Sequence, residues 1–477
     1  MLLSQQTATR LEATLNVQAA PRPFPHFWEQ MFGSGRAILS LRDDYRHDLR
    51  LVKGATGFRY IRFHGIFDDE VGLYPDYNFS YVDQIYDGLL ENGIRPFVEL
   101  SFMPKALAAS QVPHAFWYKP LPNPPASYDK WGELIYRFTE HLVKRYGLEE
   151  VAQWYFEVWN EPNIDFWTGT PMQSSYWQLY DSAAAAVKRV SPRLRVGGPA
   201  TAQAAWIDVF IAHCLEKNIP FDFVSTHVYG NDSAKDVFGT TETIARRDMV
   251  ARAVRKIYDQ VRNSAKPDTP IIWSEYNASY MNEVDVTDSP FMGPWLANNI
   301  RMCDGLQTMM SYWSFSDVFE EQGVVKTPFY GGYGLIAERG IPKAAYNAFG
   351  LLHLLGTERL PLDVDWALAT KRSDGSLAIA VWNYAEPGEA GVTADFHISL
   401  RGGERFKRAR IQVLDREHGS ALTTWERMGK PAFPTAGELR KLRDGARLPA
   451  PRAMAVSGGK IDLQLEPHAL AIVEILP

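Results

Sequence analysis

Short apolar runs alternate with longer amphipathic segments along residues 28–350 of this chain. Buried parallel strands have this apolar character, and we expect eight of them: FWEQMFG, FRYIRFHG, IRPFVEL, WYFEVWNE, LRVGGP, FDFVSTHVY, PIIWSEYN and MMSYWSF. Segments between them, such as YVDQIYDGLLENG and MVARAVRKIYDQVRN, repeat apolar residues at helical spacing. The count predicts an α/β fold, a (β/α)8 TIM barrel. An open doubly wound sheet would alternate similarly, but no Gly-rich phosphate loop follows an early strand.

The pattern changes after about residue 351. The runs LAIAVWNYA, TADFHISL, RARIQVLD, KIDLQLE and HALAIVEIL are short, alternate in polarity and are separated by turn residues. They predict a C-terminal antiparallel β-sandwich. The early segment ATRLEATLNVQ also alternates, and we expect it to join that domain. The expected organisation is therefore an N-terminal strand at residues 1–20, a barrel at 21–350 and a β-sandwich at 351–477.

Two of the expected strands end in a carboxylate. Asn160 and Glu161 follow the aromatic run at residues 154–159, and Glu275 lies near the end of PIIWSEYN. A lone Glu at a strand end is more often a helix cap or a salt-bridge partner. The Asn before Glu161 and the matched surroundings of Glu275 favour catalysis, because the carboxyl ends of barrel strands share one face and two carboxyl groups can cleave a glycosidic bond.

Further polar and aromatic residues fall on the same expected rim. They are Arg62 and His64 from the second strand, His227 and Tyr229 from the sixth, Trp313 from the eighth, and Glu320 and Glu321 in the loop beyond. Each also has a purely structural explanation, which is core packing for the two histidines and for Trp313, and a buried ion pair for Arg62. Two long loops, residues 101–128 and 314–334, would rise over this face.

The surroundings of the two glutamates predict different roles. Apolar neighbours such as Phe166 would desolvate Glu161 and favour its protonated form, as a general acid needs. Arg62 and Tyr229 would keep Glu275 ionised, as a nucleophile needs. A carboxyl separation of about 5–5.5 Å would indicate a retaining enzyme, and about 6.5–9.5 Å an inverting one.

Composition excludes several other functions. The chain has 50 Lys and Arg against 56 Asp and Glu, a net charge of −6, which gives no support for a nucleic acid or an anionic membrane as partner. The N-terminus lacks the apolar core of a signal peptide, so we expect a cytoplasmic protein. Cys214 and Cys303 are expected to be free thiols, and scattered His and Asp residues predict no metal and no cofactor.

Taken together, VWNEPN, WSEYN, THVYGND, RFHG and WSFSDVFEEQG resemble glycoside hydrolase family 39, of the bacterial β-D-xylosidase type. The resemblance implies a retaining, exo-acting β-D-xylosidase of xylan degradation, which releases xylose from the non-reducing end of xylo-oligosaccharides through a covalent glycosyl-enzyme. It implies no cofactor, and it does not decide whether the protein forms a homo-oligomer.

The resemblance also implies a role for each site residue. Glu161 would be the acid/base and Glu275 the nucleophile. The substrate contacts would be Asn160 on the sugar 2-hydroxyl, His227 and Tyr229 lining the −1 subsite, Arg62 and His64 holding Glu275 and the sugar hydroxyls, Trp313 on the pocket floor, Glu321 on a distal hydroxyl, and Phe116 and Phe166 at the entrance. The sequence does not decide which of the adjacent residues Glu320 and Glu321 contacts the sugar.

Other activities compete with this hypothesis. The same family contains α-L-iduronidases, whose substrate carries a carboxylate and needs a basic residue nearby. Here the loop after the eighth strand carries Asp317, Glu320 and Glu321, with Lys326 as the nearby base, so xylose is favoured. An arabinosidase, and a non-catalytic carbohydrate-binding protein, are the remaining alternatives.

Overall fold

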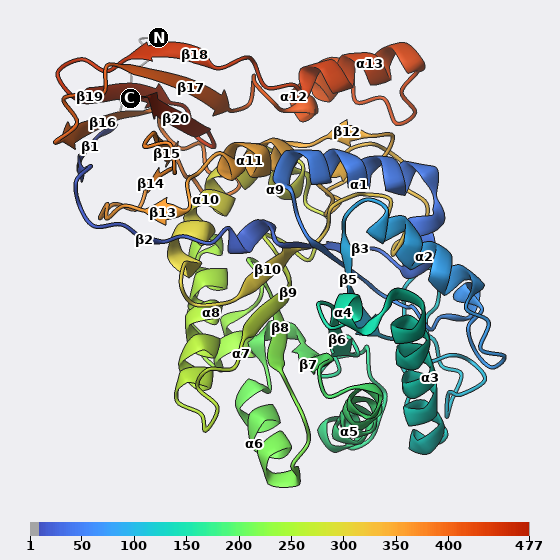
Figure 1. The fold of residues 1–477 in the computed structure, drawn as a ribbon. Helices are drawn as coiled ribbons and strands as arrows, with labels where there is room; N and C mark the ends of the chain where they lie inside the picture. Colours follow the sequence, from blue (N-terminus) through green and yellow to red (C-terminus); the bar gives the residue numbers. More distant parts are fainter. Residues whose placement is uncertain (1–8, 477) are drawn as a thin grey trace.

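The computed structural model describes residues 9–476, which form a barrel with a β-rich accessory domain packed on one side (Figure 1). Eight strands close the barrel in the order β10-β3-β4-β5-β6-β7-β8-β9, and every neighbouring pair is parallel. Their bounds are β3 Met31–Ser34, β4 Tyr60–Phe63, β5 Arg95–Leu100, β6 Tyr155–Val158, β7 Arg195–Thr201, β8 Phe223–Tyr229, β9 Ile271–Asn277 and β10 Met309–Tyr312. The predicted (β/α)8 barrel is confirmed.

Helices surround the barrel, because each buries one apolar stripe against the strands. The main ones are α1 Asp43–Thr56, α2 Ser80–Leu90, α3 Tyr128–Tyr146, α5 Met172–Val190, α6 Ile207–Lys217, α8 Arg246–Arg262, α10 Met292–Cys303 and α11 Ala344–His353. Shorter elements are η1 Phe27–Glu29, η2 Ala37–Leu41, η3 Asp69–Val71, α4 Leu148–Val151, η4 Ala202–Ala204, α7 Ala234–Phe238 and α9 Val284–Thr287, with a small hairpin of β11 Ile336–Ala337 and β12 Ile341–Pro342. None of the helices within residues 9–476 has the length and apolar content to cross a membrane.

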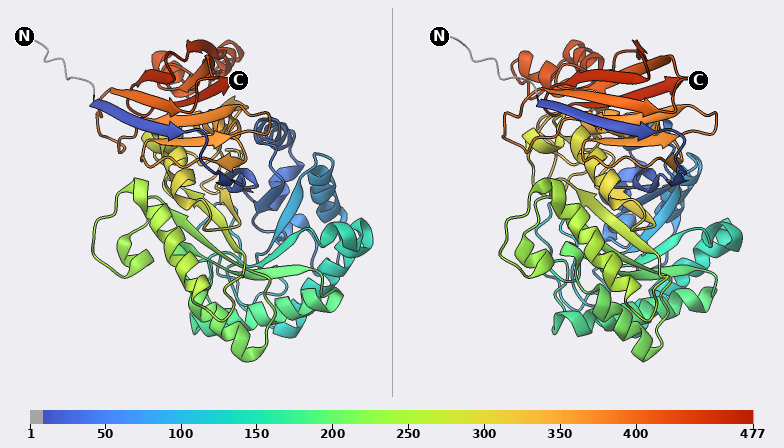
Figure 2. Two further views of the ribbon diagram at one scale, coloured as in Figure 1. Left: turned by 60° about the vertical axis from the view of Figure 1, so that its left-hand side comes forward. Right: turned by 90° about the vertical axis from the view of Figure 1, so that its left-hand side faces the viewer.

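The accessory domain consists of two sheets. The smaller has the order β1-β16-β19, and the larger has the order β18-β17-β20-β15-β14-β13-β2. The bounds are β1 Thr9–Asn16, β2 Arg22–Pro23, β13 Glu358–Arg359, β14 Ala367–Lys371, β15 Leu377–Trp382, β16 Ala394–Arg401, β17 Arg408–Leu414, β18 Arg452–Ala455, β19 Lys460–Leu465 and β20 Leu470–Leu476. In both views of Figure 2 these sheets lie stacked over the barrel, with the early strand β1 among the late ones.

The N-terminal strand joins the sandwich as expected, but its pairing is parallel. Thr9 pairs with Ala394, and the register continues to Asn16 and Arg401. The expected antiparallel order holds for the other pairings of this domain. A parallel neighbour is possible here because the connection from β1 to β16 is the whole barrel, whereas a short hairpin would impose antiparallel pairing.

Two helices interrupt the late strands, and the sequence pattern had predicted strands alone there. They are α12 Ala421–Arg427 and α13 Ala436–Gly445. The second begins with a capping box, in which the Thr435 side chain accepts from the Glu438 backbone N–H and the Glu438 carboxylate accepts from the Thr435 backbone N–H. Trp425 of α12 packs on Phe329 from the loop after β10, which ties this insertion to the barrel.

The central strands β15 and β20 of the larger sheet are buried on both faces. In β15, Leu377, Ile379 and Val381 contribute to the core between the two sheets. The alternate residues, which end with Trp382, belong to the same core as the barrel. The accessory domain therefore shares its hydrophobic core with the barrel through one face of one sheet.

Candidate active site

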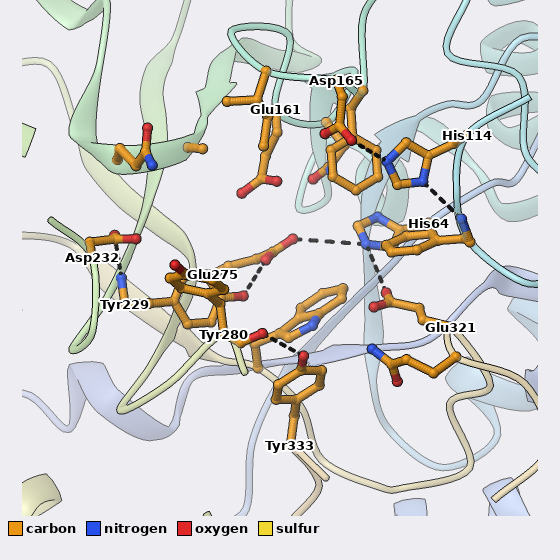
Figure 3. Close-up of a pocket in the computed structure, with 18 residues that line it drawn as sticks. His64, His114, Glu161, Asp165, Tyr229, Asp232, Glu275, Tyr280, Glu321 and Tyr333 are labelled. Atoms are coloured by element: carbon orange, nitrogen blue, oxygen red, sulfur yellow. Dashed lines mark hydrogen bonds and ion pairs between the residues drawn. The ribbon is translucent and has the colours of Figure 1, made fainter. Parts of the chain in front are cut away.

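A pocket of about 370 Å³ lies at the carboxyl ends of the barrel strands (Figure 3). The residues that line it are His64, His114, Phe116, Asn160, Glu161, Ile164, Asp165, Phe166, Ala202, Gln203, Tyr229, Asp232, Glu275, Tyr280, Trp313, Glu321, Gln322 and Tyr333. Nine of the eleven site residues that we expected from the sequence are among them. The two others, Arg62 and His227, lie behind this wall.

Glu161 reaches the pocket because the chain turns sharply after β6. Trp159 and Glu161 both have positive φ, 74° and 45°, a conformation that side chains other than Gly adopt only where the surroundings hold them. The Glu161 backbone N–H donates to the Ala200 carbonyl of β7 at 2.8 Å, and the Trp159 indole N–H donates to the Phe166 carbonyl at 2.7 Å. These bonds hold the strained turn and direct the Glu161 carboxyl into the cavity.

Glu275 lies on β9 and accepts two strong hydrogen bonds. The Arg62 guanidinium donates to one carboxylate oxygen at 2.7 Å, and the Tyr229 hydroxyl donates to the other at 2.6 Å. One oxygen of Glu275, one oxygen of Glu161 and a ring nitrogen of His227 all lie within 4.8 Å of one another. The two carboxyl groups thus face each other across the floor of the pocket.

Arg62 is fully buried beneath the pocket and pairs with more acids than expected. Besides Glu275, its guanidinium contacts Glu157 at 2.6 Å, Glu99 at 2.8 Å and the Asn160 side-chain oxygen at 2.9 Å. Sequence reasoning missed Glu99 and Glu157 because they lie inside strands rather than at strand ends. A charged residue within an otherwise apolar strand, as in FVEL and YFEV, was the available signal, since buried charges are rare unless paired.

His227 was expected to line the pocket, and the structure corrects this. Its side chain is 0% exposed and lies behind Glu161 on β8. Nδ1 is 2.9 Å from a Glu161 carboxyl oxygen and Nε2 is 3.1 Å from the Ser274 hydroxyl. Burial, and then the positive charge of Arg62, lower the pKa of His227 well below its ordinary value. His227 is therefore a neutral partner that orients Glu161 from below.

His64 lines the pocket beside Trp313, their ring centroids 4.7 Å apart. Its Nδ1 is 2.8 Å from the Glu99 carboxylate, which sets the ring orientation. Its Nε2 faces two pocket carboxyls, at 3.7 Å from Glu321 and 3.9 Å from Glu275 (Figure 3). At these distances His64 provides a polar group between the two acids without a direct hydrogen bond to either.

The two facing carboxyls differ in how their charge is stabilised. Burial raises the pKa of Glu161 well above its ordinary value, and the charges of Glu275 and Asp232 add to this. Burial also raises the pKa of Glu275, but Arg62, His64 and the Tyr229 hydroxyl oppose that rise. The pair therefore favours a proton on Glu161 and a charge on Glu275, as unlike surroundings do for other carboxyl pairs.

Glu320 and Glu321, which were not separable by sequence, have different places. Glu321 points into the pocket, and burial, with the charges of Glu275 and Glu99, raises its pKa well above the ordinary value. Glu320 points away and pairs with Arg36 at 3.2 Å and Arg42 at 2.5 Å. The pocket acid is therefore Glu321.

Several pocket residues were not predicted, and three of them, His114, Gln322 and Tyr333, come from the two long loops. His114 Nε2 is 3.3 Å from the exposed Asp165 carboxylate, and the Tyr333 hydroxyl donates to the Tyr280 carbonyl at 2.6 Å. Asp232 accepts from the Tyr229 backbone N–H at 2.8 Å. Asp232 and Tyr280 each lie three residues after a barrel strand, β8 and β9, and this position was the available signal for them. The others have no strand-end position or recognisable spacing, so only the folded chain brings them together.

Two groups of side chains among the described residues place possible metal ligands close together: Glu161 with His227 and Glu275, and His26 with Glu29 and His353. In the second, both histidine Nδ1 atoms contact one Glu29 oxygen, at 2.6 and 2.8 Å. Tetrahedral zinc with ligands at about 2.0–2.2 Å would hold its ligands roughly 3.3 Å apart. The spacing of the second group is that of hydrogen bonds, and we assign no metal to it.

Comparison with known proteins identifies the family. The model of the glycosyl hydrolases family 39 matches residues 12–460. The chain belongs to glycosyl hydrolase family 39. A β-xylosidase of Geobacillus stearothermophilus is 37% identical over 88% of this chain and 86% of that protein, and one of Caldicellulosiruptor saccharolyticus is 34% identical over 98% of both. The crystal structure of a monomeric β-xylosidase from Caulobacter crescentus CB15 is 33% identical, covers 98% of this chain and 99% of that one, and has a TM-score of 0.88. This family 39 protein is thus a glycoside hydrolase, as the motifs implied.

Proposed function

We propose that this family 39 hydrolase is a retaining, exo-acting β-D-xylosidase that acts on xylo-oligosaccharides. The facing pair of Glu161 and Glu275 carries the proposal, because oxygens of the two groups lie within 4.8 Å of each other. Retaining glycosidases hold their carboxyl groups about 5–5.5 Å apart, whereas inverting enzymes leave about 6.5–9.5 Å for a water molecule. The nearness of the β-xylosidases in sequence and structure supports the choice of sugar.

The first chemical step forms a covalent intermediate. The ionised Glu275 carboxylate attacks the anomeric carbon, and the bond from that carbon to the glycosidic oxygen breaks. Glu161 gives its proton to the departing oxygen, so the leaving sugar departs as a neutral alcohol. Arg62 and Tyr229 hold Glu275 in position for attack through the bonds at 2.7 and 2.6 Å.

The second step releases the sugar. Glu161, now ionised, takes a proton from a water molecule, and the resulting hydroxide oxygen attacks the anomeric carbon. The ester bond to Glu275 breaks, and both carboxyl groups return to their starting protonation states. Two inversions at one carbon give net retention. Neutral His227, 2.9 Å from Glu161, keeps the carboxyl aimed at the same place through both steps.

The walls of the pocket support a neutral pentose. The described lining includes no Lys or Arg, and Glu321 presents a carboxyl group. A uronate would meet that acid without a lysine or arginine partner in the wall, which disfavours an iduronide. Asn160 is placed beside Glu161, with its oxygen held by Arg62, in a position suited to a sugar hydroxyl.

Hydrolysis of an aryl β-xyloside by wild type, Glu275→Ala and Glu161→Ala tests these roles. We expect Glu275→Ala to lower turnover by roughly 10⁴-fold, because no covalent intermediate can form. With Glu161→Ala, added azide is expected to restore turnover and give a β-glycosyl azide, since a small anion can attack the intermediate without a general base. An α-azide product would indicate that Glu161 and Glu275 have exchanged roles or that the enzyme inverts. Unchanged turnover in both variants would refute the assignment.

Exo action is tested with long xylan. The loops at residues 101–128 and 314–334 both contribute to the pocket wall, and we expect them to admit only a chain end. Product analysis should then show xylose from the earliest time points. Release of internal fragments without xylose would contradict exo action. Faster hydrolysis of aryl arabinosides or iduronides than of aryl xylosides would show that xylose is not the preferred sugar.

A further inference from the structure

One buried arginine outside the pocket joins the loops of four neighbouring barrel strands. Arg36 follows β3, and its side chain is 8% exposed. Its guanidinium pairs with Glu70, in the loop after β4, at 2.7 Å, and with Glu320, in the loop after β10, at 3.2 Å. It also lies over the ring of Tyr118, in the loop after β5, at 4.8 Å from the ring centroid. A single side chain therefore contacts three loops in addition to its own.

The chemistry of this contact suits arginine and not lysine. The guanidinium is planar, so it can donate in its plane to two carboxylates while one face rests on an aromatic ring. A lysine ammonium is a compact charge on a flexible stem and offers no flat face. Burial of the charge is offset by the two carboxylates, as a buried cation requires.

The loop after β10 is held at Glu320 and at the next residue, Glu321. Glu320 has a φ of 64°, so the chain reverses there, and its side chain points out to Arg36 and Arg42 while that of Glu321 points into the pocket. The Glu321 carbonyl in turn accepts from the Trp117 backbone N–H at 2.8 Å. Arg36 and Glu320 thus hold the backbone from which the pocket acid projects.

We propose that Arg36 is a positioning residue, which acts through Glu320 to hold Glu321 where it meets the sugar. The proposal rests on the proposed function in one respect, that Glu321 contacts the substrate. It goes beyond that function by assigning substrate placement to an ion-paired clamp outside the pocket, here called the Arg36–Glu320 clamp.

A double-mutant cycle between Arg36→Lys and Glu321→Gln tests the clamp. We expect Arg36→Lys alone to lower kcat/KM for an aryl β-xyloside about tenfold, mainly through KM, and to lower it less than about twofold when Glu321→Gln is already present. Glu320→Gln should show the same dependence on Glu321. Equal fold losses in both backgrounds would show that Arg36 does not act through Glu321, and would overturn the proposal.

Hydrogen–deuterium exchange supplies a readout without substrate. Arg36→Lys should raise deuterium uptake in peptides from residues 314–334 and leave the helices of the barrel unchanged. The matched control is Arg95→Lys, which weakens a two-bond pair with Glu150 at the opposite end of the barrel; it should leave both uptake in this loop and kcat/KM unchanged. Unaltered uptake in the Arg36 variant would also overturn the proposal.

These outcomes separate the clamp from the identity of the sugar. If the wild-type enzyme prefers another aryl glycoside, the proposed function fails, and the same cycle run on that substrate still measures coupling between Arg36 and Glu321. If xylosides are hydrolysed but the losses are additive, the function stands and the clamp fails.

Discussion

Arg62 is one positive charge shared by three buried carboxyl groups, and the chemistry of the pocket depends on how that charge is shared. Glu99, Glu157 and Glu275 all lie within 2.8 Å of its guanidinium. Glu161 has no contact with it and receives a neutral histidine instead. Arg62 thus pairs directly with the nucleophile, whereas it opposes the raised pKa of the acid only from a distance, which keeps the proton affinities of the two groups apart.

Asp232 also influences the pKa of Glu161. It lies in the pocket wall, burial raises its pKa to about 7, and its negative charge raises the pKa of Glu161. Since Glu161 must be protonated to act, the alkaline limb of kcat/KM follows its pKa. Asp232→Asn removes that charge, so we expect the alkaline limb to move to lower pH in a pH–rate profile.

The control for this change is Asp208→Asn, on the exposed face of α6, which should leave the profile unaltered. An alkaline limb that stays in place, or moves to higher pH, in Asp232→Asn would show that Asp232 does not support the protonated state of Glu161. The Asn side chain can still accept from the Tyr229 backbone N–H, so the loop itself should be preserved.

At the level of single residues, the sequence predicted the side chains that stand at strand ends. The position of Glu161, Glu275 and Tyr229 follows from the strand pattern, because the ends of parallel strands meet on one face. The strand pattern of the sequence does not show which side chains are buried one layer below that face. Whether His227 faces the pocket or lies under it depends on small rotations of the strand, and these are set by packing in the folded barrel.

Among the elements, β3 has a close contact that determines the floor of the pocket. A Cβ atom on Gly33 would lie 2.1 Å from Trp313, so only glycine leaves room for the indole. We expect Gly33→Ala to displace Trp313, to cost about 1–3 kcal/mol of unfolding free energy from overpacking, and to lower kcat/KM about tenfold. Chemical denaturation and steady-state kinetics measure the two effects.

Gly350 provides a matched comparison. It lies within α11, and a Cβ there would meet no atom within 4 Å. Gly350→Ala should therefore stabilise the protein by about 0.4–1 kcal/mol, because alanine favours the helix and restricts the unfolded chain. Full activity in Gly33→Ala, with stability like that of Gly350→Ala, would show that the floor tolerates the extra methyl group.

The elements also show where pattern recognition ends. Eight barrel strands were predictable because each is a buried apolar run between amphipathic helices. The helices α12 and α13 were missed because they are short and lie between alternating strands, and short elements have too few turns for a periodic signal. The Thr435–Glu438 capping box was the local sign of α13, since this spacing marks a helix start.

For the whole molecule, the shared core predicts that barrel and accessory domain unfold together. Trp382 of β15 is 1% exposed and belongs to the core that includes the barrel. Trp382→Ala should cost about 3–5 kcal/mol, as large buried aromatics do, and lower the temperature of one common transition in calorimetry. Two separate transitions, with only one of them shifted, would show that the accessory domain is an independent unit.

The parallel pairing of β1 with β16 has a consequence for the order of events during synthesis. Thr9 is made long before its partner Ala394, which leaves the ribosome only after every strand of the barrel has been translated. The barrel can therefore close while β1 still has no neighbour, and the small sheet is completed only near the end of translation. The earliest strand within residues 9–476 is thus among the last to be built into the native structure, as contacts between distant residues form late.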